Sequence, residues 1–584
     1  MSAAAVARHQ RPIGPNYKWV ALSNTTLGVV MSSMNSSILL IALPAIFRGL
    51  NINPLEPAET SYLLWMLLGY GVITAVCLVT LGRLSDIWGR VRLYNLGFVI
   101  FTVASILLFL TPSSGNAGAL EIIIFRLVQG IGGGFLTANS AAILTDAFPS
   151  NQRGFALGLN MVAALAGSLV GLLLGGVLAA VAPWRTIFLV SIPFGVVGTV
   201  WGYLMLREQG VRRTSTRLDL GGNLLLAGGL VALLVAITYG IMPYGGSNMG
   251  WANPLVILGL IGGPVLLLLF VYVETKVEEP LFHLDLFRIR GFAIGNIAQL
   301  LFALAFGGLQ FMIIIWLQGV WLPLHGYNYE DTPLWSAIYM IPLLGGFMIF
   351  GLLGGWLSDR FSVRGLTGGG MLVLTGGFLL LMLFPANFSY LPFAIVLFVI
   401  GSAFGVFASP NSAAVMNALP REFRGVGSGM RSTFQSAGSP LSMAVFFSIV
   451  VLVLSTKLPS AMRTDLVNAG VPRQPAEQAA QVPPTGALFA AFLGYNPMET
   501  LLPKDVLDSL PPANHDKIVG KQFFPEMIST PLVDSLRAVF GFSAVLAFLA
   551  AIASFARGAR FVHEETEVVA GPPPLAAPGG LAGR

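Results

Sequence analysis

The feature that most constrains this chain is a series of long apolar runs separated by short polar loops. Apolar residues make up 55% of the 584-residue sequence, and charged residues only 10%. A run of about 20 apolar residues crosses the hydrocarbon core of a membrane as a helix. The pattern therefore predicts an all-α, polytopic membrane protein. We predict spans at residues 19–46, 61–82, 94–111, 120–145, 155–181, 186–206, 220–241, 254–274, 292–318, 334–356, 366–385, 391–418, 426–454 and 533–556.

The distribution of lysine and arginine predicts how these spans are oriented, because positive charge is retained on the cytoplasmic side. One set of short loops is rich in these residues. The opposite set, apart from one long loop, contains only Arg48 and Arg185. We therefore expect both termini in the cytoplasm. Because the basic residues are spread over many short loops, the net charge of +6 does not indicate a nucleic-acid partner.

The loop after the second apolar run, residues 82–93 (GRLSDIWGRVRL), carries several charges in a chain that has few. Gly82 and Gly89 predict a tight loop and a close approach of two helices. Asp86 can accept hydrogen bonds from helix N-termini or from arginines. Residues 355–360 (GWLSDR) repeat this motif at an offset of 273 positions, and residues 419–425 (LPREFRG) repeat 148–154 (FPSNQRG) at an offset of 271. Two landmarks at nearly one offset predict a parallel duplication.

Residues 82–93 resemble the loop signature G-x-L-a-D-x-x-G-r-k-x-x-l of the major facilitator superfamily. This resemblance implies fourteen helices, arranged as two six-helix halves plus an inserted, lipid-facing pair at 220–241 and 254–274. In the family, the loop latches the two halves in the outward-facing state. The residues that the resemblance implies for this latch are Gly82, Asp86, Gly89, Arg90, Asp146, Arg153, Asp359 and Arg360.

We accordingly divide the chain into segments. They are a cytoplasmic N-terminal tail (1–18), a first half (19–206), a linker with the inserted helices (207–291), a second half (292–556) and a disordered cytoplasmic tail (557–584). The second half contains a proline-rich exoplasmic loop (455–530). A gate, a docking site for an exoplasmic partner, a folded cap and, as the simplest explanation, a variable surface insertion all stay open for it. Its apolar piece, 486–495, is too short to span, and we expect it at the membrane interface.

The first span resembles the signature L-D-x-T-x-x-N-x-A-L-P of the fourteen-helix drug:proton antiporters, but departs from it at one important position. Ala42-Leu43-Pro44 match the end of the signature, whereas Asn35 stands at its acid position and Leu40 at its later Asn. A carboxylate within a membrane can exchange protons near neutral pH because desolvation raises its pKa. An amide cannot titrate, although Asn35 can still hydrogen-bond a substrate or a neighbouring helix.

The fourth span contains residues 122–134 (IIIFRLVQGIGGG), which are similar to the family pattern l-x-x-x-R-x-x-q-G-x-g. The resemblance implies a role for Arg126 in proton coupling, with Gln129 beside it. Ordering of the bundle through hydrogen bonds explains a deep arginine equally well, because such a charge is costly without a partner or a cavity. Glu121 is the nearest acid. At a spacing of five it does not share a helical face with Arg126.

The fifth span carries Gly167, Gly171, Gly175 and Gly176, which resemble the antiporter signature g-x-x-x-G-P-x-x-G-G with Leu172 in place of the proline. Close helix packing is the simpler explanation, because glycines four apart allow backbones to approach.

In the ninth span, Asn296 and Gln299 are three apart, and Gln310 follows Gln299 by three helical turns. These residues predict either a polar stripe facing a central cavity or helix–helix hydrogen bonds, worth about 0.6 kcal/mol each. We expect most aromatic residues to face lipid or the membrane interface.

No phosphate-binding loop, metal cluster or nucleophile–base pair stands out in the sequence. The single cysteine, Cys77, excludes an internal disulfide. We expect no enzymatic activity and no cofactor, with the proton gradient as the energy source. The resemblance implies a secondary transporter in a bacterial cell membrane that exports small amphipathic or cationic compounds (drugs) in exchange for protons. An exporter of a lipid or lipid-like metabolite and a non-transporting receptor or scaffold are the alternatives, because fold alone does not choose the substrate.

Overall fold

The computed structural model describes residues 16–557 apart from 54, 150–151, 209–218, 248, 278–279, 281 and 421–422. Within this described part the chain is helical, apart from one isolated bridge between Tyr244 and Ser247. Fourteen of the described helices or helix groups are long and apolar enough to cross a membrane. This number confirms the predicted all-α membrane fold.

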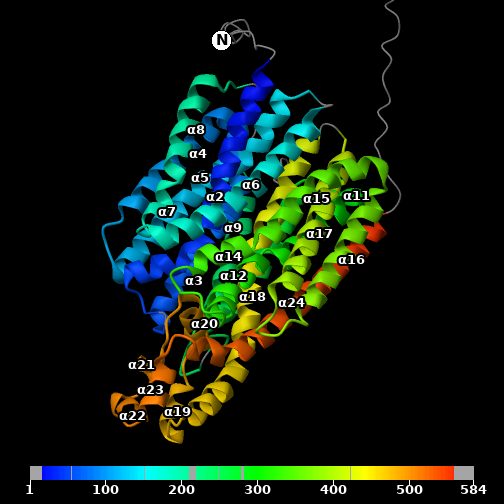
Figure 1. The fold of residues 1–584 in the computed structure, drawn as a ribbon. Helices are drawn as coiled ribbons and strands as arrows, with labels where there is room; N and C mark the ends of the chain where they lie inside the picture. Colours follow the sequence, from blue (N-terminus) through cyan, green and yellow to red (C-terminus); the bar gives the residue numbers. More distant parts are fainter. Residues whose placement is uncertain are drawn as a thin grey trace, which may run out of the picture.

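Six spans form the first bundle, which is drawn in blue to green-cyan in Figure 1. Helix α2 packs along α5 and α6, and α4 packs against α5 and α8. The short helices α7 and α8 together make the sixth span. The bounds are α2 (Tyr17–Leu50), α3 (Pro57–Trp88), α4 (Arg90–Leu110), α5 (Gly115–Ala147), α6 (Arg153–Val181), α7 (Thr186–Leu189) and α8 (Ser191–Met205).

Two further helices, α9 (Leu220–Gly240) and α10 (Pro254–Glu274), form a hairpin beside the bundles. Asp219 caps the start of α9 by accepting from the Gly222 amide at 2.8 Å. Helix α9 packs on α3 of the first bundle and on α18 (Arg424–Asn468) of the second. Helix α10 lies outside α9, and its outer leucines are among the most exposed apolar residues of the chain. A lipid environment suits such a surface.

The second bundle also has six spans. Helix α15 packs along α17, α16 lies between α17 and α24, and α11 packs on α18 and α24. The two bundles meet where α6 packs on α14 and α15, and where α3 packs on α18. The bounds are η3 (Leu284–Arg288), α11 (Arg290–Phe306), α12 (Leu309–Trp316), η4 (Leu317–Trp321), α13 (Leu322–Leu324), α14 (Thr332–Tyr339), α15 (Ile341–Arg360), α16 (Val363–Leu381), α17 (Tyr390–Asn417), α18 and α24 (Phe523–Ala556).

The first span of the second bundle is interrupted between α11 and α12, at Gly307 and Gly308. Ser442 of α18 satisfies the backbone at this break. Its hydroxyl oxygen accepts from the Gly308 amide at 3.0 Å, and the hydroxyl donates to the Leu304 carbonyl at 2.6 Å. Because the helix is not continuous here, the count of three turns from Gln299 to Gln310 does not hold.

Helix α18 continues past its predicted end at 454, and α24 begins before 533. The 45 residues of α18 extend about 67 Å at 1.5 Å per residue, about twice the hydrocarbon thickness. Lys457 and Asp534 form an ion pair at 2.6 Å, and Arg537 donates to Asp534 at 3.0 Å. The end of α18 was predicted too early because the apolar run stops at residue 454. The helix itself continues, because a helix outside a bilayer does not need apolar residues on its surface.

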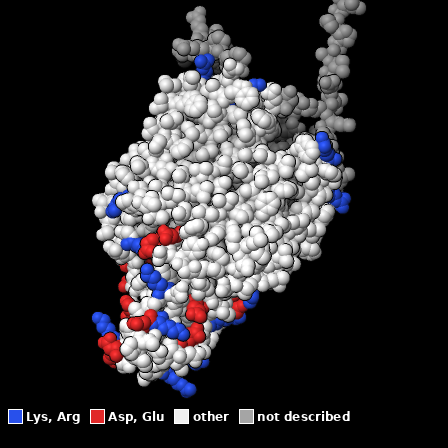
Figure 2. Space-filling model, in the orientation of Figure 1, with Lys and Arg blue, Asp and Glu red and all other residues white. Residues whose placement is uncertain are grey.

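Residues 469–522 form a cap of short helices between α18 and α24, seen at the bottom of Figure 1. Each helix of this cap starts at or directly after a proline, whose fixed φ and missing N–H suit a helix start. Figure 2 shows charged side chains gathered on the cap, while the bundles are almost uncharged on this face. The cap helices are α19 (Arg473–Ala479), α20 (Pro484–Leu493), α21 (Met498–Leu501), α22 (Lys504–Asp508) and α23 (Pro512–Val519).

The apolar piece of the cap, helix α20, does not lie at a membrane interface as predicted. All ten of its residues are buried. It contacts α2 and α3 of the first bundle and α18, α24 and η4 of the second, so it joins both bundles at the cap end. The short length of α20 correctly predicted that it does not span a membrane. Its predicted location was wrong because the apolar residues that bury it come from helices that are distant in the sequence.

Candidate functional site

A buried polar cluster in the first bundle surrounds Arg126, which is only 1% exposed. Arg126 and Gln129 are three apart on α5 and therefore share a face. The Arg126 guanidinium donates to Gln129 Oε1 at 2.8 Å, and Asn35 Nδ2 of α2 donates to the same oxygen at 3.0 Å. Gln129 Nε2 in turn donates to Ser105 Oγ of α4 at 2.8 Å. Side chains from three helices thus meet around one glutamine.

Tyr70 of α3 covers the other side of the Arg126 guanidinium. The guanidinium carbon lies 4.7 Å from the centre of the Tyr70 ring, a cation–π contact. The Tyr70 hydroxyl is 2.7 Å from the Ser32 hydroxyl. Arg126 Nε has no hydrogen-bond partner among the described residues. All the partners that the structure gives this buried cation are therefore neutral. We refer to Arg126, Gln129, Asn35, Ser105 and Tyr70 as the Arg126 cluster.

Glu121, the nearest acid in the sequence, does not neutralise this charge. Ser113 donates to its Oε1 at 2.6 Å, and its Oε2 is buried without a described partner. The structure therefore brings together Asn35, Arg126 and Gln129 among the predicted site residues and leaves Glu121 apart. This agrees with the spacing of five, which places the two side chains on different faces of α5.

The predicted polar residues of the second bundle lie in different surroundings. Asn296 donates to the Phe292 carbonyl of its own helix at 2.9 Å. Gln299 accepts from Asn411 Nδ2 of α17 at 3.2 Å. Gln310 is half-buried on α12, and its Nε2 has no described partner. These residues do not join into one described polar stripe.

Arg557, directly after α24, reaches into this part of the second bundle and donates to Asn411 Oδ1. Its Nε and one terminal nitrogen are buried without described partners. Burial lowers the pKa of Arg557 to about 10. Sequence reasoning missed this residue, because an arginine at the end of a span is the ordinary marker of a membrane boundary.

An aromatic cluster fills the interior of the second bundle. The rings of Phe302 and Phe407 stack with centroids 4.7 Å apart, and those of Phe306 and Phe404 meet at 3.7 Å. Phe347 of α15 lies 6.1 Å from Phe306. We expected most aromatic residues to face lipid or the membrane interface, whereas these are buried or half-buried. Their spacings of three and four residues on α11 and α17 are the signal that was available in the sequence.

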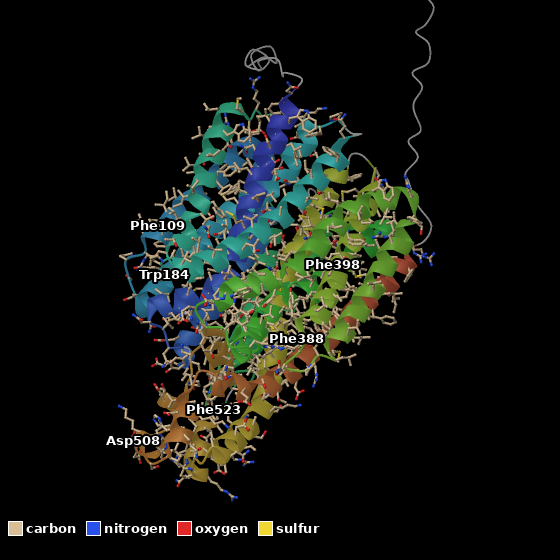
Figure 3. All side chains as sticks on the ribbon, viewed as in Figure 1. Phe109, Trp184, Phe388, Phe398, Asp508 and Phe523 are labelled. Atoms are coloured by element: carbon tan, nitrogen blue, oxygen red, sulfur yellow. The ribbon has the colours of Figure 1, made fainter. Side chains whose placement is uncertain are left out.

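A second aromatic group lies closer to the cap. Trp321 stacks on Phe388 with centroids 5.2 Å apart, and its indole N–H donates to the Phe388 carbonyl at 2.9 Å. Trp316 meets Phe388 edge-on at 5.1 Å. Figure 3 labels Phe388 in the second bundle, on the side towards the cap, and Asp508 at the far end of the cap. The interior of the second bundle is thus aromatic over much of its length.

The predicted latch loop forms a compact cluster within the first bundle. Arg90 at the start of α4 donates to both carboxylate oxygens of Asp146 on α5, each at 2.8 Å. Glu208 accepts from the amides of Arg90 and Val91 at 2.8 and 3.1 Å and so caps α4. Sequence reasoning missed Glu208, which follows the sixth span and approaches α4 only in the folded bundle.

Only Gly89 separates α3 from α4, with a φ of 111° that strongly favours glycine. Gly82 lies inside α3 rather than in the loop, because the helix runs to Trp88. The side chains of Asp86, Arg153 and Asp359 lie outside the described part of the structure. Arg360 is exposed, and its guanidinium carbon lies 4.0 Å from the centre of the Trp356 ring. A latch between the two bundles stays a prediction.

The glycines of the fifth span lie at helix contacts. A Cβ at Gly167 would lie 2.7 Å from the Val30 carbonyl oxygen of α2. Gly171 and Gly175 face the same helix one and two turns further on. Gly176 instead faces the second bundle, where its Cβ would lie 2.8 Å from Leu334 Cα of α14. Small residues therefore hold α6 against α2 and bring the two bundles into contact.

Among the described residues, no group of three or more His, Cys, Asp or Glu side chains is placed to hold a metal ion.

Comparison with known proteins identifies the family. The model of the Major Facilitator Superfamily matches residues 25–443. The chain belongs to this superfamily. The match includes the Arg126 cluster, the latch loop and most of both bundles, whereas the cap and α24 lie beyond it.

Several curated members of the superfamily are similar over most of the chain. The riboflavin transporter RibZ of Clostridioides difficile is 27% identical, covering 74% of this chain and 88% of its own length. Multidrug resistance protein 3 of Bacillus subtilis is 27% identical, covering 74% and 80%. The tetracenomycin C resistance and export protein of Streptomyces glaucescens is 26% identical, covering 82% and 85%.

Solved structures of the superfamily support the fold. A bacterial homologue of the human lysosomal transporter Spinster, in an inward-facing and unoccupied conformation, has a TM-score of 0.54 at 16% identity. The match covers 94% of this chain and all of that one. The protein is therefore a membrane transporter of the superfamily by sequence, and its helices follow the arrangement of solved members.

Proposed function

We propose that this protein exports small amphipathic organic compounds across a bacterial cell membrane, by alternating access and in exchange for protons. The observation that carries this proposal is the contrast inside the two bundles. The first buries the polar Arg126 cluster, and the second buries the cluster around Phe302 and Phe404. A molecule with one polar and one aromatic part finds partners of both kinds. The relatives named for multidrug resistance and export support the direction of transport.

In this proposal both termini are cytoplasmic, the loop at Arg90 is on the cytoplasmic side, and the cap is exoplasmic. The two halves, 19–206 and 292–556, rock against each other. Helix α20 then closes the exoplasmic side, because it is buried between both bundles. It must withdraw when the halves part on that side.

Glu121 is the proton-exchanging group that we propose, because its Oε2 is buried without a described partner. The polar residues of the Arg126 cluster include no carboxylate.

The first test is efflux from liposomes that contain the purified protein. Wild type, Glu121→Gln and the control Glu499→Gln, on the exposed surface of the cap, are compared with and without an imposed pH gradient. We expect gradient-driven efflux of an amphipathic dye in wild type and the control. In Glu121→Gln we expect only efflux down the dye gradient. Equal gradient dependence in all three would remove Glu121 from the proposal, and no protein-dependent efflux at all would refute export of such compounds.

The movement of α20 is tested separately by labelling cysteines with a membrane-impermeant maleimide. Ala491→Cys is made in a Cys77→Ser background, since Ala491 is 1% exposed. We expect little labelling at rest and faster labelling during transport. Ser509→Cys, on the exposed surface of the cap, should label at the same rate in both conditions. An Ala491→Cys rate that transport does not change would contradict an opening at α20.

One observation favours a lipid-like substrate as a second candidate. An apolar groove of about 200 Å³ lies between α9 and α18, lined by Ile237, Trp251, Val445, Ser448, Ile449 and Leu452. Fluorescent lipid analogues in the same liposomes test it. Protein-dependent movement of the lipid, but not of soluble dyes, would favour this candidate over the first.

A further inference from the structure

We propose that the transported compound carries an acidic group, a carboxylate, sulfonate or phosphate, and that Arg126 binds this group. The proposal deepens the export function proposed above, and the claim that the acidic compound is transported rests on that function. Binding of an acidic compound at Arg126 can be tested without transport. Three observations carry it: the positions of the acidic residues, the partners of Arg126, and the partners of two half-buried arginines in the second bundle.

Most acidic residues of the spans lie towards the helix ends, and Asp534, the twelfth residue of α24, is paired with Lys457 and Arg537. Arg126, the twelfth of the 33 residues of α5, is almost completely buried. A membrane-embedded cation is ordinarily paired or faces a cavity. Among the described residues, no carboxylate forms an ion pair with Arg126. The acids within the fourteen spans and their helices are Glu59, Asp86, Glu121, Asp146, Glu274, Asp359, Asp465, Glu526 and Asp534.

The neutral partners of Arg126 leave part of its binding capacity unused. One terminal nitrogen donates to the Gln129 amide oxygen, and the Tyr70 ring covers a face. Nε is buried and has no described partner. A guanidinium presents its donors as a planar fork that matches two oxygens of one acidic group, and such charge-assisted pairs are the strong ones. A carboxylate, sulfonate or phosphate would neutralise the charge and engage the free donor. A cationic group would be repelled.

Asn35 keeps this position available for an external anion. It touches Gln129, the residue that accepts from Arg126. A carboxylate at position 35 would lie in the same hydrogen-bonded group and compete for the guanidinium. The amide found there satisfies Gln129 without neutralising Arg126.

Two half-buried arginines also lie near helix ends of the second bundle. Arg431 of α18 donates to Ser412 Oγ at 3.0 Å, and Arg557 donates to Asn411. Neither forms an ion pair with a described residue. No described side chain neutralises these two arginines, so they also favour an anionic over a cationic group near them.

The test uses two fluorescent probes that differ in one group, 8-anilino-1-naphthalenesulfonate and the uncharged N-phenyl-1-naphthylamine. Binding to the full-length protein in detergent is measured for wild type, Arg126→Gln, Arg126→Lys and Arg288→Gln. Arg288 is an exposed control, with 86% of its side chain accessible. The same probes and an ethidium-type cation are then compared in liposome efflux.

We expect the sulfonate to bind wild type and Arg288→Gln equally, and Arg126→Gln at least tenfold more weakly. Arg126→Lys should be intermediate, because it keeps the charge but loses the fork. The uncharged probe should change less than twofold across all four proteins. Equal loss of both probes in Arg126→Gln would mean a merely structural role and would overturn the proposal.

If the variants fail to fold, binding and efflux measurements on the wild-type protein still test the proposal. Efflux of the cation but not of the sulfonate would refute the acidic cargo and leave the export function standing. Binding of the sulfonate through Arg126 without efflux of any probe would support the site and refute export. No preference for the sulfonate over the uncharged probe in binding would refute the site directly.

Discussion

The interiors of the two bundles differ at positions that are related by the 271-residue offset of the predicted duplication. On α5, Arg126 and Gln129 are the centre of the polar cluster. The residues 271 positions later on α17 are Leu397 and Ile400, and both are fully buried. One turn beyond Ile400, Phe404 joins the aromatic cluster. At these matching positions the first bundle buries a polar pair and the second bundle an apolar pair. For an exporter of amphipathic molecules, this provides two kinds of surface in one protein.

The largest effect should come from the aromatic side of the comparison. Phe404→Ala removes a ring that contacts Phe302, Phe306 and Phe347. A buried Phe→Ala change costs about 3–5 kcal/mol, because transfer energy and a cavity add up. We expect a clear fall in the thermal unfolding temperature in detergent. Phe398→Ala, at a half-exposed ring of the same helix (38% exposed), is the matched control and should fall less. Equal falls would mean that the cluster adds nothing beyond ordinary packing.

The polar side should respond in a different way, through coupling between neighbours. Gln129→Leu removes the acceptor of Arg126 and leaves a buried cation with fewer partners, at a cost of about 1–3 kcal/mol. Arg126→Gln removes that cation, so the double variant should recover most of the loss. A double-mutant cycle on unfolding temperatures measures this coupling. Simple additivity of the two changes would show that Gln129 does not stabilise Arg126.

The comparison is sharpened by placing an acid in the polar cluster. In Asn35→Asp, the new carboxylate should form an ion pair with Arg126, because residue 35 already contacts the Gln129 oxygen that accepts from Arg126. We expect sulfonate binding to weaken about tenfold, equivalent to about 1.4 kcal/mol. Asn296→Asp, at the buried polar residue of α11, introduces the same charge in the other bundle and should weaken binding less. A sulfonate affinity that Asn35→Asp leaves intact would contradict competition at Arg126.

The smallest effect is expected at the loop between α3 and α4. Arg90 and Asp146 are about one quarter exposed, so solvent screens their attraction. Arg90→Gln should lower stability by about 1 kcal/mol or less. If the loop also latches the two halves, Arg90→Gln should slow transport much more than this small loss explains. Unchanged flux with a normally expressed protein would limit the pair to its visible role of joining α4 to α5.

Local patterns predicted much of the fold. Apolar runs predicted fourteen spans, because a helix in lipid needs about 20 apolar residues regardless of its neighbours. They misplaced the ends of α18 and α24, which continue as helices beyond the bundles. The spacing of Arg126 and Gln129 predicted a shared face, and the structure shows their hydrogen bond. Glu208 and Arg557 had no such local signal, because their partners lie in other helices.

The sequence by itself determined that this chain is a polytopic helical protein with a repeated loop motif, and that Asn35 stands at the acid position of the antiporter signature that its first span resembles. Those properties depend on residue type and spacing along one chain. Only the tertiary structure decided that Arg126 has neutral partners, that phenylalanines from three helices meet in the second bundle, and that α20 is buried between the bundles. Each of these depends on which surfaces distant helices present to one another. That choice is a property of the packed bundle and not of any single helix.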